Sequence, residues 1–273
     1  SRSEFHPEAR VKFRYWGLIP VIDQSQHLLR LNKAIASSGL CSRRKADELI
    51  SQGKVAVNGQ TVQELGLRVN PVADRVAVDG KVLDIPLPGR GAGVTVAMHK
   101  PVRVVSTASD PQGRQTVVEL LPEDLRRQRL VPVGRLDFFS EGLLLLSNSG
   151  ELIHRLTHPR WHVTKTYQVL ISGDMPSEAL ETMTRGMTLQ EGDILAPVRV
   201  SVVRPSKGGT WLELEIHQGV NRQIRRMCRD LNLTVLRLIR TRHGPVSLGS
   251  LAPGRIRRLN ELEVVELRSL VGL

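Results

Sequence analysis

The spacing of apolar and polar positions predicts a small mixed domain near the start of the chain. Apolar residues recur at helical spacing over 28–39, and a second helix is predicted over 42–51, where a serine stands as a favourable N-cap. Strand-like stretches follow at 54–57 and 75–78. Each runs into an Asn-Gly or Asp-Gly pair, which is typical of a tight hairpin turn. Residues 28–85 are therefore predicted to form an α+β domain.

Regular periodicity is lost on both sides of this first domain. Residues 1–27 show no clear period and are predicted to be an arm or tail. Residues 86–93 are rich in proline and glycine, break both the helical and the strand period, and are predicted to be a linker. Residues 94–273 are then regular almost to the end and are predicted to form the second domain.

Strand patterns outnumber helix patterns in the second domain. Strands are predicted at 94–98, 142–146, 163–171, 211–216 and 235–239. Helices are predicted at 116–121, at 223–231, and from a capping Ser177 to Gly186. Because the two kinds of element do not alternate regularly, the pattern favours an α+β fold with a mixed, mostly antiparallel sheet and flanking helices.

Composition narrows the class of partner. The 39 Lys and Arg exceed the 27 Asp and Glu by 12, which favours a polyanion, with nucleic acid ahead of a membrane surface. Aromatics are only 3%, which argues against a surface of stacked aromatic platforms. Cys41 and Cys228 form no CxxC pair, so a disulfide framework and a cysteine-based zinc site are excluded. No apolar run is long enough to span a membrane, and a cytoplasmic setting is expected.

A basic cluster stands where the second predicted helix begins. Arg43, Arg44 and Lys45 occupy its first turn, where cations oppose the helix dipole. A bound phosphate explains this arrangement, because phosphates favour both helix N-termini and cationic side chains. Lys33 and Lys54 extend the cluster. The competing interpretation is an ordinary solvated charged face.

Three stretches of the first domain resemble the S4 domain, a small RNA-binding fold. They are residues 31–33, the run 39–47, and 53–59, which ends in Asn-Gly. The resemblance implies binding to structured RNA through the basic cluster, and it implies no reaction.

One carboxylate stands out in the second domain. The run Gly134-Arg135-Leu136-Asp137 leads, through two phenylalanines, into Gly142 and four consecutive leucines. A loop that bears one carboxylate thus enters a buried strand. Apolar surroundings disfavour the ionised carboxylate and a nearby cation restores it, and a nucleophile or general base needs that ionised form. The alternative is a turn or capping residue.

This run, together with residues 142–148, resembles the signature of RNA pseudouridine synthases, specifically the RsuA-type family of bacterial ribosomal RNA enzymes. The resemblance implies that Asp137 is catalytic, with Arg135 and Leu136 beside the substrate. His99, before Lys100 and Pro101, departs from the asparagine usual in the family.

Residues 157–159 and 165–167 resemble a second motif of the family. Lys165 and Tyr167 are two apart on a predicted strand and so share a face. The resemblance implies that Tyr167 packs on the target base and that Lys165 contacts the substrate. The alternative for Tyr167 is a core position.

The run 218–228 resembles a third motif and is predicted to lead into an amphipathic helix. Ile224, Met227, Cys228 and Leu231 fall on one apolar stripe, and Arg222, Arg226 and Arg229 gather opposite, where they suit RNA phosphates. An ordinary amphipathic surface helix is the alternative.

Arg225 falls at the edge of that stripe, so it is predicted to be half-buried and to pair with a carboxylate. The resemblance implies that this carboxylate is Asp137. Asn221 and Gln223 of the same run are further candidates for substrate binding.

The resemblance extends over about residues 28–268, including the segment 236–240, which suggests Leu238 as an apolar contact under the base. It implies that a uridine of ribosomal RNA, large subunit favoured over small, is flipped out and isomerised to pseudouridine without a cofactor. The expected partner is ribosomal RNA or a ribosome assembly intermediate, no membrane, with the protein a monomer. The alternative is a non-catalytic RNA-binding or ribosome-assembly protein on the same fold.

Overall fold

The computed structural model describes residues 28–86 and 93–273. The chain divides into two compact units between residues 90 and 91, and each is described by itself. The predicted arm, 1–27, and most of the predicted linker lie outside the described residues.

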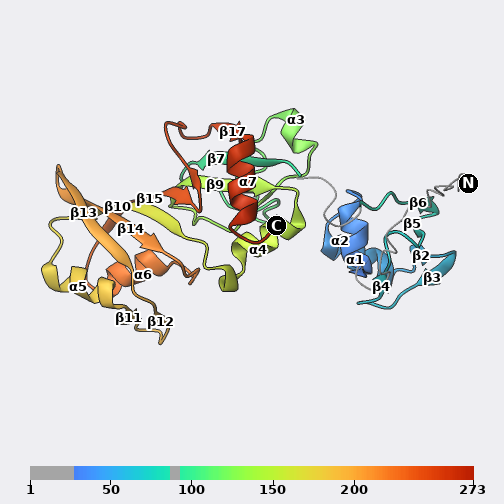
Figure 1. The fold of residues 1–273 in the computed structure, drawn as a ribbon, viewed down its shortest axis with the longest axis horizontal. Coiled ribbons are helices and arrows are strands. Elements are labelled where there is room, and N and C mark those ends of the chain that lie inside the picture. Colours follow the sequence, from blue (N-terminus) through green and yellow to red (C-terminus); the bar gives the residue numbers. More distant parts are fainter. Residues whose placement is uncertain (1–27, 87–92) are drawn as a thin grey trace, which may run out of the picture. The chain divides into compact units, whose positions relative to one another are not determined.

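The N-terminal unit packs two helices on a small antiparallel sheet (Figure 1). Its helices are α1 (Leu31–Ser37) and α2 (Arg43–Ser51). Its four-stranded sheet has the order β3 (Gln60–Val62), β2 (Val55–Val57), β5 (Val76–Val78) and β6 (Lys81–Val82), while β1 (Leu29–Arg30) pairs with β4 (Arg68–Val69). The apolar periodicity explains this unit: Leu31, Ile35 and Ile50 are fully buried against Val55 and Val76.

The capping and turn residues of this unit act as predicted. The Ser42 side chain accepts a hydrogen bond from the Lys45 backbone N–H at 3.2 Å, which starts α2. Asn58 and Asp79 both have positive φ, as do the glycines that follow them, which is the geometry of a two-residue hairpin turn.

The C-terminal unit is built on one mixed sheet. Among the described residues this sheet has nine strands, in the order β13 (Arg199–Ser206), β14 (Gly209–Ile216), β10 (Lys165–Ser172), β15 (Val235–His243), β9 (Glu141–Ser147), β7 (Thr95–Lys100) and β17 (Ile256–Arg258), with β16 (Val246–Ser247) on β15 and β8 (Val131–Pro132) on β9. All pairs are antiparallel except β15 with β9. The predicted fold class, α+β with a mostly antiparallel sheet, is confirmed.

Helices cover this sheet in two groups (Figure 1). Near one end, α5 (Ser177–Arg185) and α6 (Gln223–Asp230) pack on β10 and β14, beside the short hairpin β11 (Met187–Thr188) and β12 (Ile194–Leu195). Near the other, α4 (Gly150–Thr157), the 3-10 turn Pro159–Trp161 and α7 (Glu261–Ser269) pack on one face of β7 and β9, and α3 (Glu123–Arg126) packs on the opposite face. Both faces of β9 are therefore covered, which explains its four consecutive leucines.

Three local predictions need correction. Residues 116–121 form turns rather than a helix, and the helix α3 begins only after Pro122, which lacks an N–H and suits that boundary. Ser177 is the first residue of α5 rather than its cap, which is Pro176. The strand β15 continues to His243, because pairing with β10 holds residues beyond the apolar run.

The sheet order sets the position of the Asp137 loop. This loop immediately precedes β9, and the parallel pairing of β9 with β15 places Gly142 opposite Arg240. A β-carbon on Gly142 would lie 2.6 Å from the Arg240 backbone nitrogen, and φ at Gly142 is +107°. Glycine is thus required where the loop enters the sheet.

Candidate active site

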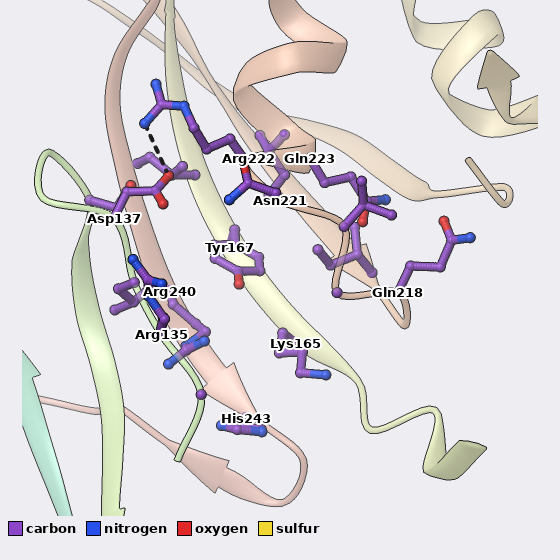
Figure 2. A pocket seen from close by; sticks show the side chains of 18 of the residues that line it. Arg135, Asp137, Lys165, Tyr167, Gln218, Asn221, Arg222, Gln223, Arg240 and His243 are labelled. Atoms are coloured by element: carbon purple, nitrogen blue, oxygen red, sulfur yellow. Dashed lines mark ion pairs between the residues drawn. The ribbon is translucent and has the colours of Figure 1, made fainter. Parts of the chain in front are cut away.

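A pocket of about 360 Å³ opens among the Asp137 loop, strands β10 and β15, and the start of α6 (Figure 2). The lining includes the predicted residues Arg135, Leu136, Asp137, Lys165, Tyr167, Asn221, Arg222, Gln223, Arg225 and Leu238. Arg226 is the one predicted residue of this unit that does not line it. Segments far apart in sequence therefore meet at one cavity.

The backbone of the Asp137 loop is held by hydrogen bonds from the Ser106 side chain and from within the loop. Ser106 Oγ accepts from the Leu136 N–H at 3.0 Å and donates to the Leu136 carbonyl at 2.8 Å. The Ser140 N–H donates to the Asp137 carbonyl at 3.0 Å. Leu136 is buried, whereas the Asp137 side chain keeps 29% of its surface exposed. The loop thus holds one carboxylate at the wall of the pocket.

Lys100 supports this loop with its buried side chain. Its side chain is fully buried, and Nζ donates to the carbonyls of Pro101 and Ser140, each at 2.8 Å. Burial lowers the pKa of Lys100 to about 8, while the negative charges of Asp137 and Glu141 oppose that change. His99, the departure from the family pattern, is also buried and bonds the Leu251 carbonyl through Nδ1 at 2.7 Å.

The ion pair to Asp137 comes from Arg222, which corrects the predicted pair with Arg225. Arg222 Nη1 lies 3.5 Å from Asp137 Oδ2 (Figure 2). Arg222 is the N-cap of α6 and has a φ of +49°. The predicted helix faces assumed helical backbone angles at this residue, which it does not have. Arg225 is half-buried as predicted, but its Nη2 donates to the Phe139 carbonyl at 2.8 Å. Burial lowers the pKa of Arg225, and the Asp137 charge acts the other way.

Arg226 and Arg229 are engaged within the protein rather than free for RNA. Arg226 Nη2 lies 3.0 Å from Glu191 Oε2 and also bonds Asp193, and Arg229 Nη1 lies 2.7 Å from Glu191 Oε1. These acids belong to the turn of the β11–β12 hairpin, so the two arginines tie α6 to it. Helical spacing predicts which residues face outward, but it does not show that a hairpin distant in sequence pairs with them.

This cluster makes the hairpin sensitive to acid. Hydrogen bonds from Arg229 and then Arg226 lower the pKa of Glu191 from 4.5 to about 2. The stability that Glu191 contributes is therefore present above about pH 4.5 and is lost as the pH falls toward 2. We expect Glu191→Gln to lower the melting temperature at about pH 6, to have a smaller effect at about pH 3, and to lose most of the effect at about pH 2. A difference in melting temperature between variant and wild type that is as large at about pH 2 as at about pH 6 would contradict this account. Glu213→Gln, at an exposed position of the otherwise packed strand β14, is the control.

Tyr167 lies in the middle of the pocket, on strand β10, which is paired on both sides (Figure 2). Its strand neighbours are Leu214 on one side and Arg240 on the other. The ring also packs against two of the apolar clusters while staying only partly buried. Tyr167 is thus partly buried against the core, and its aromatic ring also lines the cavity.

Arg240 and His243 are among the lining residues that the sequence did not predict as site residues. Arg240 stands two positions after Leu238 and so shares its strand face, a signal that could have identified it. A bulge in β15 opposite Thr166 and Tyr167 then returns His243 to that face, opposite Lys165. Such a register shift leaves no signal in the sequence.

The basic cluster predicted for the N-terminal unit is exposed there. Lys33 lies on α1, Arg43, Arg44 and Lys45 form the first turn of α2, and Lys54 precedes β2; all five are exposed. Lys45 pairs with Glu48 at 2.7 Å, and Arg43 bonds Asn32 at 3.4 Å.

Comparison with known proteins identifies the two units. Residues 94–230, about half of the chain, match the family described as RNA pseudouridylate synthase, and residues 29–76 match the S4 domain. The chain belongs to the RNA pseudouridylate synthase family. It is 39% identical to the Bacillus subtilis protein named ribosomal large subunit pseudouridine synthase B, over 88% of this chain and 96% of that one.

Further relatives agree with this family. An Aquifex aeolicus protein named as an uncharacterized RNA pseudouridine synthase is 39% identical, over 90% of this chain and 96% of the relative. A crystal structure of a pseudouridylate synthase superposes with a TM-score of 0.62 at 28% identity, covering 88% of this chain and 99% of that one. The protein is therefore an RNA-modifying enzyme with an S4 domain. None of the helices in the described parts of the synthase has the length and apolar character to cross a bilayer.

The S4 domain of this synthase offers a direct test of its basic cluster. Replacing Arg44 by Gln should weaken RNA binding a few-fold and reduce the slope of log affinity against log salt by about 0.7 to 0.9, since one phosphate contact is lost. The measurement is filter binding across a salt series. Lys81→Gln, an exposed cation on β6, is the matched control. Equal effects of the two variants would show that Arg44 contributes only general charge.

Proposed function

We propose that this synthase isomerises a uridine of large-subunit ribosomal RNA to pseudouridine, with Asp137 as the catalytic residue. The Bacillus subtilis relative, by its name, supports the choice of subunit. The observation that carries the proposal is the pocket itself, where Asp137 is the only carboxylate among the lining residues that the structure describes and lies beside Tyr167 and Arg222.

The reaction breaks the bond from C1′ of the sugar to N1 of uracil, turns the base, and forms a bond from C1′ to C5. The proton on C5 is lost and N1 gains one, so no atom is added overall and no cofactor is expected. A stacked uridine must first leave the helix and enter the pocket, which costs a few kcal/mol. Contacts with RNA phosphates on both units supply the binding free energy for that step.

Asp137 acts at the sugar, as a nucleophile at C1′ or as a base at C2′, and both roles need the ionised form. The Arg222 guanidinium, 3.5 Å away, stabilises that form. The Arg225 charge adds to the same field while its hydrogen bond to Phe139 supports the loop. Arg222 and Arg225 are positioning residues for the carboxylate.

The base contacts come from the sheet. Tyr167 offers a flat ring against which uracil can turn, and Leu238, opposite Val169 on the neighbouring strand, forms an apolar surface next to it. Arg135, Leu136, Asn221 and Gln223 line the walls around the nucleotide. We place the protein in the cytoplasm as a monomer, acting on ribosomal RNA or on an assembly intermediate.

The decisive experiment is pseudouridine mapping after incubation of the purified protein with ribosomal RNA. We expect one new pseudouridine in the large-subunit RNA and none in the small-subunit RNA, supplied free or as assembly intermediates. A modification in the small-subunit RNA would correct the choice of subunit. No modification of either RNA, despite binding, would favour the non-catalytic RNA-binding alternative.

A further inference from the structure

Three cationic side chains and a histidine gather on one side of Tyr167, away from Asp137. In Figure 2, Asp137 and Arg222 lie on one side of the tyrosine ring, and Arg135, Arg240, Lys165 and His243 lie on the other. Strand pairing explains the grouping, because Arg240 is opposite Tyr167 and His243 is opposite Lys165. Strand pairing therefore brings these basic side chains together at one end of the pocket, which we call the cationic end.

Two of these groups, Arg240 and His243, are buried and have polar atoms without a partner among the described residues. Arg240 is 3% exposed; its Nε donates to the Leu143 carbonyl at 2.7 Å, but its Nη2 has no partner. His243 is 2% exposed, and neither of its ring nitrogens has a partner among the residues that the structure describes. Buried donors without acceptors cost free energy, so a native protein that keeps them is poised for a ligand that supplies acceptors.

The charges of this end are also uncompensated. Burial and the nearby Arg240 lower the pKa of Lys165 to about 8, and burial with both cations lowers the pKa of His243 well below 6.5. His243 is therefore neutral at physiological pH and offers one N–H. The only carboxylate among the described lining residues, Asp137, already has Arg222 as its partner. Arg240 and Lys165 therefore favour the binding of an anion at this end of the pocket.

A uracil carbonyl supplies acceptors but no charge, whereas a phosphate supplies both. RNA carries a phosphate on each side of every nucleotide, so a uridine that enters the pocket brings anionic groups with it. We propose that Lys165 and Arg240, with Arg135 and the neutral His243 beside them, form a subsite for a backbone phosphate next to the target uridine. This inference rests on the proposed function and adds which part of the nucleotide this end of the pocket recognises.

Binding of small nucleotides to the full-length protein tests the subsite. The probes are uridine, uridine 5′-monophosphate, uridine 3′-monophosphate and inorganic phosphate, titrated by NMR. We expect one monophosphate to bind about tenfold or more tightly than uridine, because charge-assisted hydrogen bonds form only with the phosphate. Inorganic phosphate should compete with that monophosphate.

Variants then assign the discrimination to this end of the pocket. Lys165→Gln should reduce the preference for the monophosphate to about twofold without changing uridine affinity, and Lys165→Arg should keep it. Lys207→Gln, an exposed lysine in the β13–β14 turn, should behave as the wild type. Melting temperatures confirm that each variant is folded.

Four results would overturn the subsite. Uridine and both monophosphates could bind alike, or none could bind. Lys165→Gln could weaken uridine and the monophosphates equally, which would assign Lys165 to the base. Lys207→Gln could match Lys165→Gln, which would reduce the effect to general charge. Because binding requires no turnover, pseudouridine mapping fails or succeeds separately, and failure of the subsite is distinguishable from failure of the proposed function.

Discussion

Replacing Asp137 by asparagine should reduce pseudouridine formation by on the order of a thousandfold or more. The amide has nearly the same size but provides neither a nucleophile nor a base, and no second carboxylate lines the described pocket to replace it. RNA affinity should stay within a few-fold of the wild type, because the cations that we propose to contact RNA phosphates are unchanged. Single-turnover kinetics and filter binding measure the two quantities.

Asp174→Asn provides the control for this variant. Asp174 is exposed in the segment before α5 and does not line the pocket, so its amide should leave the rate unchanged. Retained activity in Asp137→Asn would remove this carboxylate from the chemistry. A matched loss of RNA affinity and melting temperature would assign it a structural role instead.

Replacing Gly142 by alanine should cost about 3 kcal/mol or more of unfolding free energy. The φ of +107° is strained for any L side chain, and a β-carbon would lie 2.6 Å from the Arg240 nitrogen and 3.0 Å from the Arg240 carbonyl carbon. Relief requires β9 and β15 to separate. Because that contact sets the Asp137 loop against the pocket, catalysis should fall together with stability, as measured by urea unfolding and single-turnover kinetics.

Gly150→Ala is the matched control for the glycine. Gly150 begins α4, has no positive φ, and has nothing within 4 Å of an added β-carbon. Its replacement should be neutral or stabilise by about 0.4–1 kcal/mol, because alanine restricts the unfolded chain. If Gly142→Ala and Gly150→Ala were equally stable, the close approach of β9 to β15 would not be the constraint that the geometry indicates.

Local patterns predicted much of the fold. The Ser42 cap, the Asn-Gly and Asp-Gly turns and the buried run of leucines are properties of neighbouring residues, and the structure confirms them. Strand β13 was missed because its alternation of polar and apolar residues lasts only from Arg199 to Val202, before a register shift, and most of its residues are exposed. The segment 116–121 has helix-compatible residues but forms turns, since packing of Val117 and Leu121 on β7 and β9 decides it.

The sequence predicted many of the residues that line the pocket, but it did not predict which of them form ion pairs. Motifs and strand faces brought Asp137, Tyr167 and Lys165 into one pocket, as the lining confirms. Which arginine meets Asp137 depends on the left-handed backbone of Arg222, and which arginines are free depends on where Glu191 lies. Both are relations between segments that helical spacing does not contain.

By itself, then, the amino-acid sequence determined the fold class, the two-unit organisation and several of the helices, strands and turns, because those follow from periods and turn residues within a few positions. The residues grouped for the chemistry followed from motifs that resemble those of the family. Only the tertiary structure decided that Arg222 partners Asp137, that Arg226 is held by the β11–β12 hairpin, and that Arg240 and His243 join Lys165. The physical reason is that sheet register, a bulge and loop closure bring together charges far apart along the chain, and their electrostatic environment exists only once they are close.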